Sequence, residues 1–411
     1  MTKLKKKKVK EMSRYLVKLK PVGAFFFGGE RIFSFYEKGM KFKNNIIKSR
    51  EFPQQTSILG MIRKEILVLN KLIREKWDYK PEQKGKIKKL IGEKSFDIAG
   101  SNEDFGIINS ISPVFIVEEI DGVDRFLIKV PKDHNQNKNY NNYVPLKFND
   151  DKGNCLKVKT DLSKEVYLPI DFDAKKGLSD DFVDIEKGNI ISRDKVFIKD
   201  SSIGIRLDEK HIAQENSLFR LEKYKFNYDK DYEKENKCFA FILDIEDDKE
   251  SNTSFENYRN VVALGGEGSY FSISLEKITF DIKEKINFVD KQKVSFIIEE
   301  KMPCEKEQLL DKKEIYKIIL LSDTYISKRV YEENCMYSIS KRIDFRSLKS
   351  ENYNENKQKG NAYYNRFDKS KNRYSFLEKG SVLFAYKTGY DELLKSINNS
   401  KLQKIGYNIF I

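Results

Sequence analysis

The chain has 411 residues, more than one domain usually needs, so we expect two domains of similar size, each able to bury a core. Its 78 lysines and arginines against 64 acidic residues give a formal net charge of +14, which favours a polyanionic partner. The alternative is a lysine-rich surface set by genome composition, since asparagine, isoleucine and tyrosine are also abundant. The four scattered cysteines, without a CxxC pair, argue against a zinc site or a disulfide framework.

No apolar run approaches the roughly 20 residues that cross a bilayer. The N-terminal lysines are not followed by the apolar core of a signal peptide. We therefore expect a soluble, cytoplasmic protein, with no metal and no cofactor.

The N-terminal part contains, one after another, an apolar strand that ends at glycines, a basic loop and an amphipathic helix. Alternation over residues 14–20 predicts a strand, an apolar segment then breaks at Gly28-Gly29, and a basic loop follows. A Pro-Gln-Gln-Thr-Ser turn opens an amphipathic helix, predicted from residue 57 to about 77. Its apolar stripe is Ile58, Ile62, Ile66, Leu69 and Ile73. Thr56 or Ser57 is expected to cap this helix, whose positive end suits phosphate.

Further elements follow in chain order. Two strands, over residues 105–118 and 125–130, are separated by the hairpin signal Asp121-Gly122. Residues 131–189 are polar and indicate an insertion with hairpin elements, because a long structureless stretch inside a domain is unusual. Later strands are predicted at 218–227, 238–244, 268–278, 314–321 and 381–386, with a short helix at 251–263. This pattern predicts a mixed α+β fold.

Several motifs lie in the order found in one protein family. They are Phe27-Gly28-Gly29, Lys48-Ser49, Phe52-Pro53, Leu59-Gly60-Met61-Ile62-Arg63, Ile203-Gly204-Ile205-Arg206-Leu207, Asn216-Ser217-Leu218-Phe219, Leu264-Gly265-Gly266-Glu267-Gly268, Lys379-Gly380-Ser381-Val382-Leu383-Phe384 and Ile405-Gly406-Tyr407-Asn408. With them the chain resembles the RAMP-superfamily proteins of CRISPR systems, most closely subunit three of the type III-B (Cmr) effector complex. The family usually has an arginine after Gly-Gly-Glu, and Gly268 and Ser269 stand there instead.

The resemblance implies two ferredoxin-like, RRM-type β-α-β-β-α-β domains, at residues 1–231 and 232–411. It also implies a thumb hairpin within residues 133–200. The family member grips the 5′ handle of the CRISPR RNA beside the large polymerase/cyclase-type subunit and the backbone RAMP subunits, and it leaves cleavage to other subunits. Carried onto this sequence, the chain is expected to be a non-catalytic, RNA-binding subunit in antiviral defence.

The candidate RNA-binding residues lie in the early basic loop, the turn before the helix, the helix and the glycine-rich loop. They are Lys41, Lys43, Lys48, Ser49, Arg50, Gln54, Gln55, Thr56, Arg63, Gly265, Gly266 and Gly268. Basic residues interleaved with Phe42 and Phe52 suit a groove that tracks phosphates while bases stack on rings, although both rings can instead be core residues. Tyr363, Tyr364, Arg366 and Arg373 form a second, weaker aromatic and basic cluster.

Catalytic signals are weaker than binding signals. RNA cleavage without a metal needs a base and an acid, usually histidines, and both His134 and His211 are interpreted as solvent-facing turn residues. The acidic pairs Glu118-Glu119, Asp180-Asp181 and Asp247-Asp248 are interpreted as solvated turns without metal-site spacing. The alternatives kept open are an endoribonuclease that processes CRISPR repeats, the equivalent subunit of a type III-A or III-D complex, and an RNA-binding protein outside CRISPR.

Overall fold

The computed structural model describes residues 12–32, 36–37, 40–41, 45–73, 80–100, 104–137, 140–160, 165–208, 210–228, 236–247, 255–301, 310–346, 348–350, 367–369 and 372–411. Two compact units alternate along the chain. The first contains Met1–Gln83, Val114–Phe126 and Ser192–Thr279, and the second contains Lys84–Pro113, Leu127–Ile191 and Phe280–Ile411. The domains expected from the sequence, residues 1–231 and 232–411, are each one continuous segment, and this division stays a prediction.

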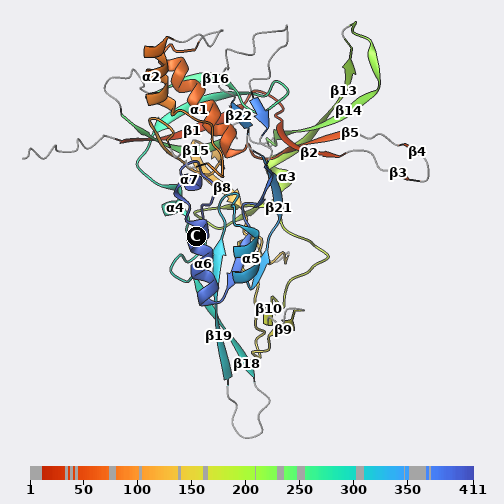
Figure 1. The fold of residues 1–411 in the computed structure, drawn as a ribbon. Coiled ribbons are helices and arrows are strands. Elements are labelled where there is room, and N and C mark those ends of the chain that lie inside the picture. The colour runs from red at the N-terminus through yellow and green to blue at the C-terminus, as the bar shows by residue number, and fades with distance from the viewer. Residues whose placement is uncertain are drawn as a thin grey trace, which may run out of the picture. The chain divides into compact units, whose positions relative to one another are not determined.

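An antiparallel sheet forms the centre of the first unit (Figure 1). Its neighbouring strands in this unit are β7 (Phe115–Ile120), β15 (Asn236–Glu246), β1 (Met12–Pro21), β17 (Tyr270–Lys277) and β16 (Arg259–Ala263), in that order. On β1, Val17 and Leu19 are fully buried while Lys20 is exposed, as expected for a strand with one face on the core. The strands predicted at 14–20, 238–244 and 268–278 are confirmed.

Helix α1 (Gln55–Leu69) belongs to the same unit. Ile58, Ile62 and Ile66 are fully buried, which confirms most of the predicted stripe. The predicted C-terminal end was wrong, because Lys71 takes a positive φ of 55° and Ile73 is 45% exposed beyond the helix. A new helix, α2 (Pro81–Ile91), follows in the chain.

A second sheet in the first unit has the order β13 (Phe197–Leu207), β14 (Ala213–Phe226), β5 (Asn45–Arg50) and β2 (Phe27–Ile32). β14 and β5 are parallel, and the other neighbours are antiparallel. The β13–β14 hairpin continues past the ends of β2 and β5 (Figure 1). Its first strand follows the short helix α3 (Arg193–Val196), and a small ladder joins β3 (Tyr36–Glu37) to β4 (Met40–Lys41).

Aromatic rings fill the core of the first unit. The ring centroid of Phe25 lies 5.1 Å from that of Phe27 and 5.1 Å from that of Phe239. Phe52 is buried with its ring 5.7 Å from Phe239, so it is a core residue and does not stack on a base. Phe42 lies outside the described residues.

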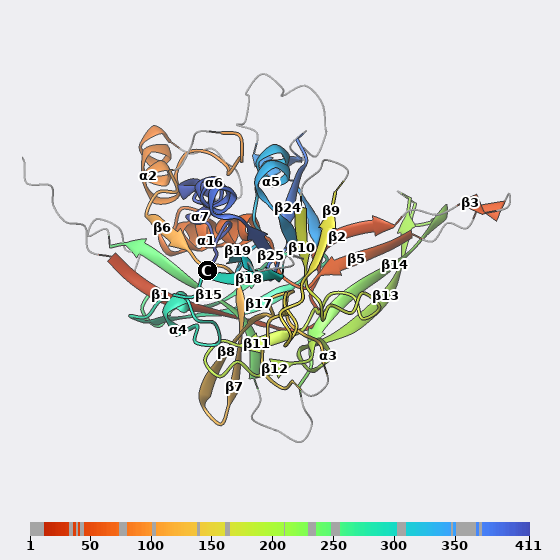
Figure 2. The same cartoon turned by 90° about the horizontal axis from the view of Figure 1, so that it is seen from below.

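The second unit has a sheet with the order β18 (Ser295–Lys301), β19 (Leu310–Ile319), β25 (Val382–Ala385) and β20 (Tyr337–Ile339). Helices α5 (Lys328–Asn334) and α6 (Lys387–Ile397) lie side by side (Figure 2), and α6 contacts β19 and β25. Fully buried Leu383 and Leu393 join this layer to the sheet. The strands predicted at 314–321 and 381–386 are confirmed, whereas α6 was not predicted.

Short elements complete the description. They are β6 (Ile108–Ile111), β8 (Val123–Lys129), β9 (Leu156–Lys159), β10 (Glu165–Leu168), β11 (Phe182–Asp184), β12 (Ile190–Ile191), α4 (Ile282–Lys285), β21 (Arg342–Phe345), β22 (Leu348–Ser350), β23 (Phe367–Lys369), β24 (Tyr374–Leu377) and α7 (Ser400–Gln403). The predicted hairpin turn is confirmed, since Asp121 and Gly122 both have positive φ, 51° and 80°. The β9–β10 ladder confirms a hairpin inside the 131–189 insertion.

The helix predicted at 251–263 was wrong over the described residues 255–263, which form a turn and then strand β16 (Arg259–Ala263), paired with β17. Its Val-Val pair favours a strand, and exposure rises and falls along it. The mixed α+β class, with mostly antiparallel sheets, is confirmed. Among the helices of the described ranges, none is both long enough and apolar enough to span a bilayer.

Candidate nucleic-acid interface

The glycine-rich loop between β16 and β17 is fastened to the backbone of Phe26. The Gly266 N–H donates to the Phe26 carbonyl at 2.9 Å, and the Phe26 N–H donates to Ser269 Oγ at 2.8 Å. Gly265 has a φ of +90°, and a Cβ there would lie 2.3 Å from the Phe26 carbonyl oxygen. Only glycine therefore permits this close approach of two backbone segments.

The outer side of the same loop is open. Glu267 and Gly268 have positive φ of 55° and 68°, and a Cβ at Gly268 would meet nothing within 4 Å. Gly268 and Ser269 stand where the resembled family usually has an arginine. Ser269 is buried, and its hydroxyl donates to the Gly266 carbonyl at 2.6 Å. Ser269 therefore shapes the loop, while Gly268 leaves its backbone accessible to a ligand.

Strand β5 contacts Phe27, the residue after Phe26, through the side chain of Ser49. Buried Ser49 accepts a hydrogen bond from the Phe27 N–H at 2.8 Å and donates to the Arg50 carbonyl at 2.8 Å. Two serines that are distant in sequence, Ser49 and Ser269, thus accept from the consecutive amides of Phe26 and Phe27. These two hydrogen bonds bring the Lys-Ser motif and the Gly-Gly-Glu motif together at Phe26 and Phe27. The spacing of the motifs in the sequence did not predict this contact.

Not all predicted site residues are placed for binding. Lys48 is exposed on β5, Arg50 is half-buried, and the hydroxyl of Ser49 is already engaged. Gln55 is buried, whereas Gln54, Thr56 and Arg63 are half-buried. Lys43 and the side chain of Lys41 lie outside the described residues, as do Tyr363, Tyr364 and Arg366.

The predicted side-chain cap of α1 was wrong. The helix begins at Gln55, so Thr56 and Ser57 lie inside its first turn. The N-cap is Gln54, whose extended backbone (φ −70°, ψ 143°) directs its carbonyl to the Ser57 N–H at 2.9 Å, with no side-chain cap. The first turn of α1 therefore lacks the hydroxyl partner that we expected for it.

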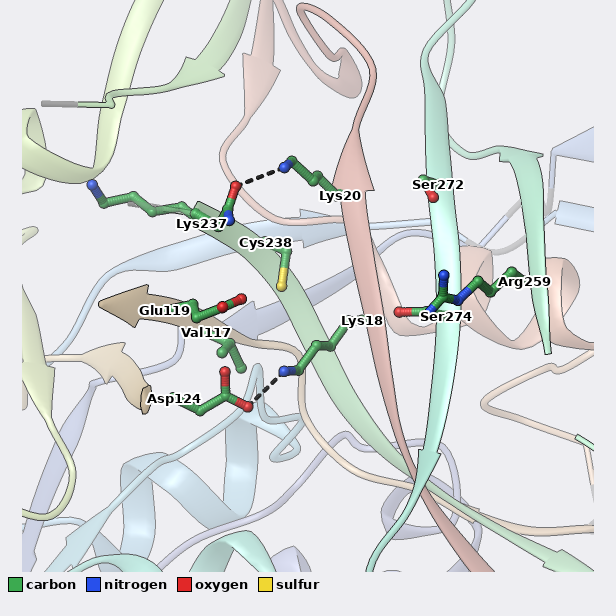
Figure 3. A pocket seen from close by; sticks show the side chains of 11 residues that line it. Lys18, Lys20, Val117, Glu119, Asp124, Lys237, Cys238, Arg259, Ser272 and Ser274 are labelled. Carbon is green, nitrogen blue, oxygen red and sulfur yellow. Dashed lines mark hydrogen bonds and ion pairs between the residues drawn. The ribbon is translucent and has the colours of Figure 1, made fainter. Parts of the chain in front are cut away.

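The open face of the central sheet carries a hollow of about 250 Å³ that sequence reasoning missed (Figure 3). Lys18 and Lys20 of β1, Arg259 of β16, and Ser272 and Ser274 of β17 line it. The signal was present in the sequence, because Lys18 and Lys20 alternate with buried Val17 and Leu19. Glu119 and Asp124 also line it, so the hollow adds a charged, hydroxyl-bearing surface with cations in excess to the first unit.

The candidate catalytic groups are dispersed. His211 is exposed in the β13–β14 turn with a φ of 60°, as predicted, whereas His134 is only 6% exposed, so the solvent-facing interpretation was wrong for it. Glu118 is also buried, 3% exposed, and lies 3.2 Å from Lys237, which contradicts its interpretation as a solvated turn. Within the part of the chain that the structure describes, no cluster of three or more potential ligands is arranged to hold a metal ion.

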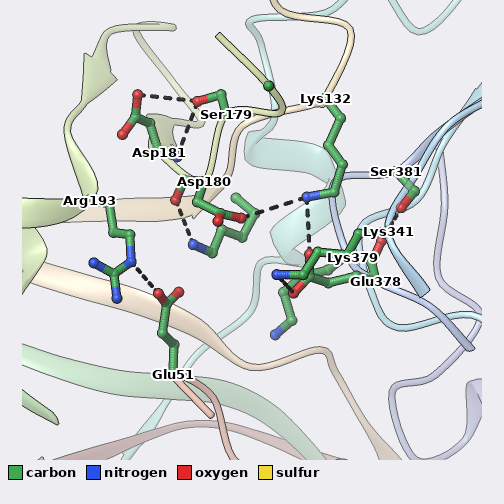
Figure 4. A network of polar contacts seen from close by, with 12 residues as sticks. Glu51, Lys132, Ser179, Asp180, Asp181, Arg193, Lys341, Glu378, Lys379 and Ser381 are labelled. Carbon is green, nitrogen blue, oxygen red and sulfur yellow. Dashed lines mark hydrogen bonds and ion pairs between the residues drawn. The ribbon is translucent and has the colours of Figure 1, made fainter. Parts of the chain in front are cut away.

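The Asp180-Asp181 pair takes part in a polar network of the second unit (Figure 4). Buried Lys132 lies 3.1 Å from a carboxylate oxygen of Glu378 and 3.9 Å from one of Asp180. Asp181 accepts from the Ser179 hydroxyl at 3.1 Å. The acidic pair thus contacts residues of the insertion itself, and Lys132 links the insertion to Glu378, which follows β24.

Burial of His134 predicts a pH-dependent stability. Desolvation lowers the pKa of His134 below its ordinary value of 6.5, opposed in part by contacts with the Val144 backbone. Below pH 6.5 the unfolded chain therefore binds a proton that the folded chain binds only at lower pH, so the free energy of unfolding falls on acidification. We expect His134→Gln to flatten this fall in urea titrations between pH 7.5 and 5. His211→Gln is the matched control, and an equal flattening there would contradict the assignment.

Comparison with known proteins assigns these motifs to a family. The model of the CRISPR-associated protein family Cas_Cmr3 matches residues 17–410. Chains from two cryo-EM structures of type III-B Cmr-beta bound to cognate target RNA, one of them with AMPPnP, are similar at 14% identity and a TM-score of 0.44, covering 97% of this chain and 96% of each of those chains. No curated protein matches. Because the family model spans nearly the whole chain and agrees with the motifs above, the chain belongs to the Cas_Cmr3 family of CRISPR-associated proteins.

Proposed function

We propose that this chain is the Cmr effector-complex subunit that binds the 5′ handle of the CRISPR RNA without cleaving it. The observation that carries the proposal is the meeting of two family motifs at Phe26 and Phe27, through Ser49 on one side and Ser269 on the other. A loop held to Phe26 on its inner side and open at Gly268 suits close backbone approach to phosphate. Exposed Lys48 supplies positive charge on the neighbouring strand.

The β13–β14 hairpin is proposed as the thumb. It begins at Phe197, so it lies almost wholly beyond the segment 133–200 where the thumb was placed from the resemblance. Its distal part exposes branched apolar side chains, with Ile203 75% and Leu218 58% exposed. At its middle the ring of Phe219 covers Gly204, where a Cβ would lie 2.3 Å from the ring, and this contact stiffens a long two-stranded ribbon. Such a ribbon suits insertion beside a guide strand.

The remaining parts of the proposal follow the family. The proposed partners are the large polymerase/cyclase-type subunit and the backbone RAMP subunits. The proposed location is the cytoplasm. We also propose that the chain is built from two ferredoxin-like domains. The endoribonuclease alternative is tested by incubating repeat RNA with the full chain and with a His134→Gln, His211→Gln double variant. We expect no cleavage by either protein. Cleavage that the double variant loses would favour the enzyme instead.

Charge reversal tests the handle site. We expect Lys48→Glu to weaken binding of handle RNA and to reduce the slope of log K against log salt by about 0.7 for each phosphate that the variant no longer neutralises. Arg50→Glu is expected to act in the same direction. Lys277→Glu, an exposed residue at the end of β17, is the control, and fluorescence anisotropy at several salt concentrations is the measurement. A salt slope equal to that of the unmodified chain would remove Lys48 from the site.

A further inference from the structure

The open face of the central sheet presents an ordered set of side chains. Cα register places Lys18 opposite Ser274 and Lys20 opposite Ser272 across β1 and β17. On the next strand Arg259 stands opposite Ser274. Residues directly opposite one another on neighbouring strands share a face, so these cations and hydroxyls lie on the same surface (Figure 3).

Charge on this face is balanced at one end and unbalanced at the other. Lys18 lies 2.6 Å from the Asp124 carboxylate, and Arg14, farther along β1, lies 2.7 Å from Asp244. Lys20 instead donates to the neutral side-chain oxygen of Asn236 at 2.7 Å. Within the described ranges neither Lys20 nor Arg259 forms an ion pair with a carboxylate. Positive charge therefore remains available at Lys20, on the side of the glycine-rich loop, and at Arg259, which stands level with Lys18, although the carboxylates of Glu119 and Asp124 line the same hollow.

An exposed aromatic ring belongs to this same end. Tyr270 is the first residue of β17, two positions after Gly268, and it is 54% exposed. Register sets Tyr270 opposite Ala263 and sets Ser272 opposite Val261, which is 60% exposed. An aromatic and a branched apolar side chain thus extend the face that carries Lys20 and Ser272.

We propose that this sheet face is a second part of the RNA site, where single-stranded RNA leaving the glycine-rich loop stacks a base on Tyr270 and sets its phosphates against Lys20 and Arg259. Ser272, opposite Lys20 on β17, donates its hydroxyl to a phosphate or a ribose. Single-stranded RNA fits because it supplies negative charge and free base faces together, whereas a duplex hides its bases. The inference rests on the proposed function in taking RNA as the ligand.

The test uses the full chain and single-stranded handle RNA carrying 2-aminopurine at each position in turn. We expect one position to be quenched on binding, and we expect Tyr270→Ala to abolish that quenching and to weaken affinity roughly 5- to 150-fold. Tyr270→Phe retains the ring and should behave like the unmodified chain. Tyr140→Ala, which truncates a 38% exposed tyrosine of the second unit, is the matched control.

Arg259→Glu tests the phosphate contact separately. We expect the salt slope to fall by about 0.7 relative to the unmodified chain, while thermal unfolding stays unchanged because the side chain is exposed. Unaltered affinity and quenching in Tyr270→Ala would overturn the inference and leave the handle site at Lys48 intact. Conversely, if Lys48→Glu has no effect while Tyr270→Ala still weakens binding, the proposed handle site fails and this surface stands alone. Loss of a copurifying subunit without any change in RNA affinity would assign the face to a protein and also overturn the inference.

Discussion

Replacing Glu118 by alanine is expected to lower the free energy of unfolding by about 3–5 kcal/mol, because it leaves a buried cation without its counter-charge. Glu118 and Lys237 stand directly opposite each other on β7 and β15, are 3% and 2% exposed, and approach to 3.2 Å. Arg125 forms a second ion pair with the same carboxylate. Lys237 also donates to the Asn227 carbonyl at 2.8 Å, so its ammonium cannot swing into solvent without breaking that bond.

Urea unfolding monitored by circular dichroism measures this effect. Glu119→Ala is the control, since Glu119 is the next residue and only half-buried, and we expect it to change stability by less than about 0.5 kcal/mol. The double variant Glu118→Leu, Lys237→Met should recover much of the loss, because an apolar pair removes both buried charges together. A loss below about 1 kcal/mol in Glu118→Ala would contradict the buried pair.

Gly265→Ala is expected to destabilise the chain by at least about 2 kcal/mol and to weaken handle RNA binding. The new Cβ would lie 2.3 Å from the Phe26 carbonyl oxygen at a φ of +90°, so the loop has to move away from β2. Loop displacement breaks the hydrogen bonds by which Gly266 and Ser269 hold Phe26. RNA binding falls with stability because the open side of the loop moves as well.

Gly268→Ala separates backbone strain from displacement. Gly268 also has positive φ, 68°, but open space surrounds a Cβ there, so we expect a cost of about 1 kcal/mol and a loop that stays in place. Gly23→Ala, with open space and no positive φ, should be neutral. Thermal unfolding and anisotropy on the same samples compare the three variants. Equal effects of Gly265→Ala and Gly268→Ala would contradict the close approach at Phe26.

Sequence periodicity predicted the elements whose burial pattern is regular. The alternation at β1 and the stripe at Ile58, Ile62 and Ile66 were recognised because one face of each element meets the core. The strand β16 was mistaken for a helix because it is short and does not alternate cleanly between polar and apolar residues, since Val261 is apolar and exposed. Local sequence carries little information in such cases, since the pairing with β17 decides the structure.

The candidate site was predictable only in part. The glycine-rich loop and Lys48 could be found from their motifs, but the contacts of Ser49 and Ser269 with one short segment depend on the fold. His134 was misplaced because its polar neighbours in sequence indicate a turn, while tertiary packing buries it. The surface around Lys20 and Tyr270 is spread over separate strands, so only strand register brings it together.

The triple phenylalanine at residues 25–27 has a consequence for how the proposed ligand is received. All three rings are buried, at 0%, 7% and 3% exposure, although successive residues of an extended segment point in opposite directions. The segment that anchors the glycine-rich loop is therefore held from both sides before any RNA arrives. Little conformational entropy then remains to be lost on association, so slow amide hydrogen exchange at Phe26 and Phe27 should already be present in the free chain.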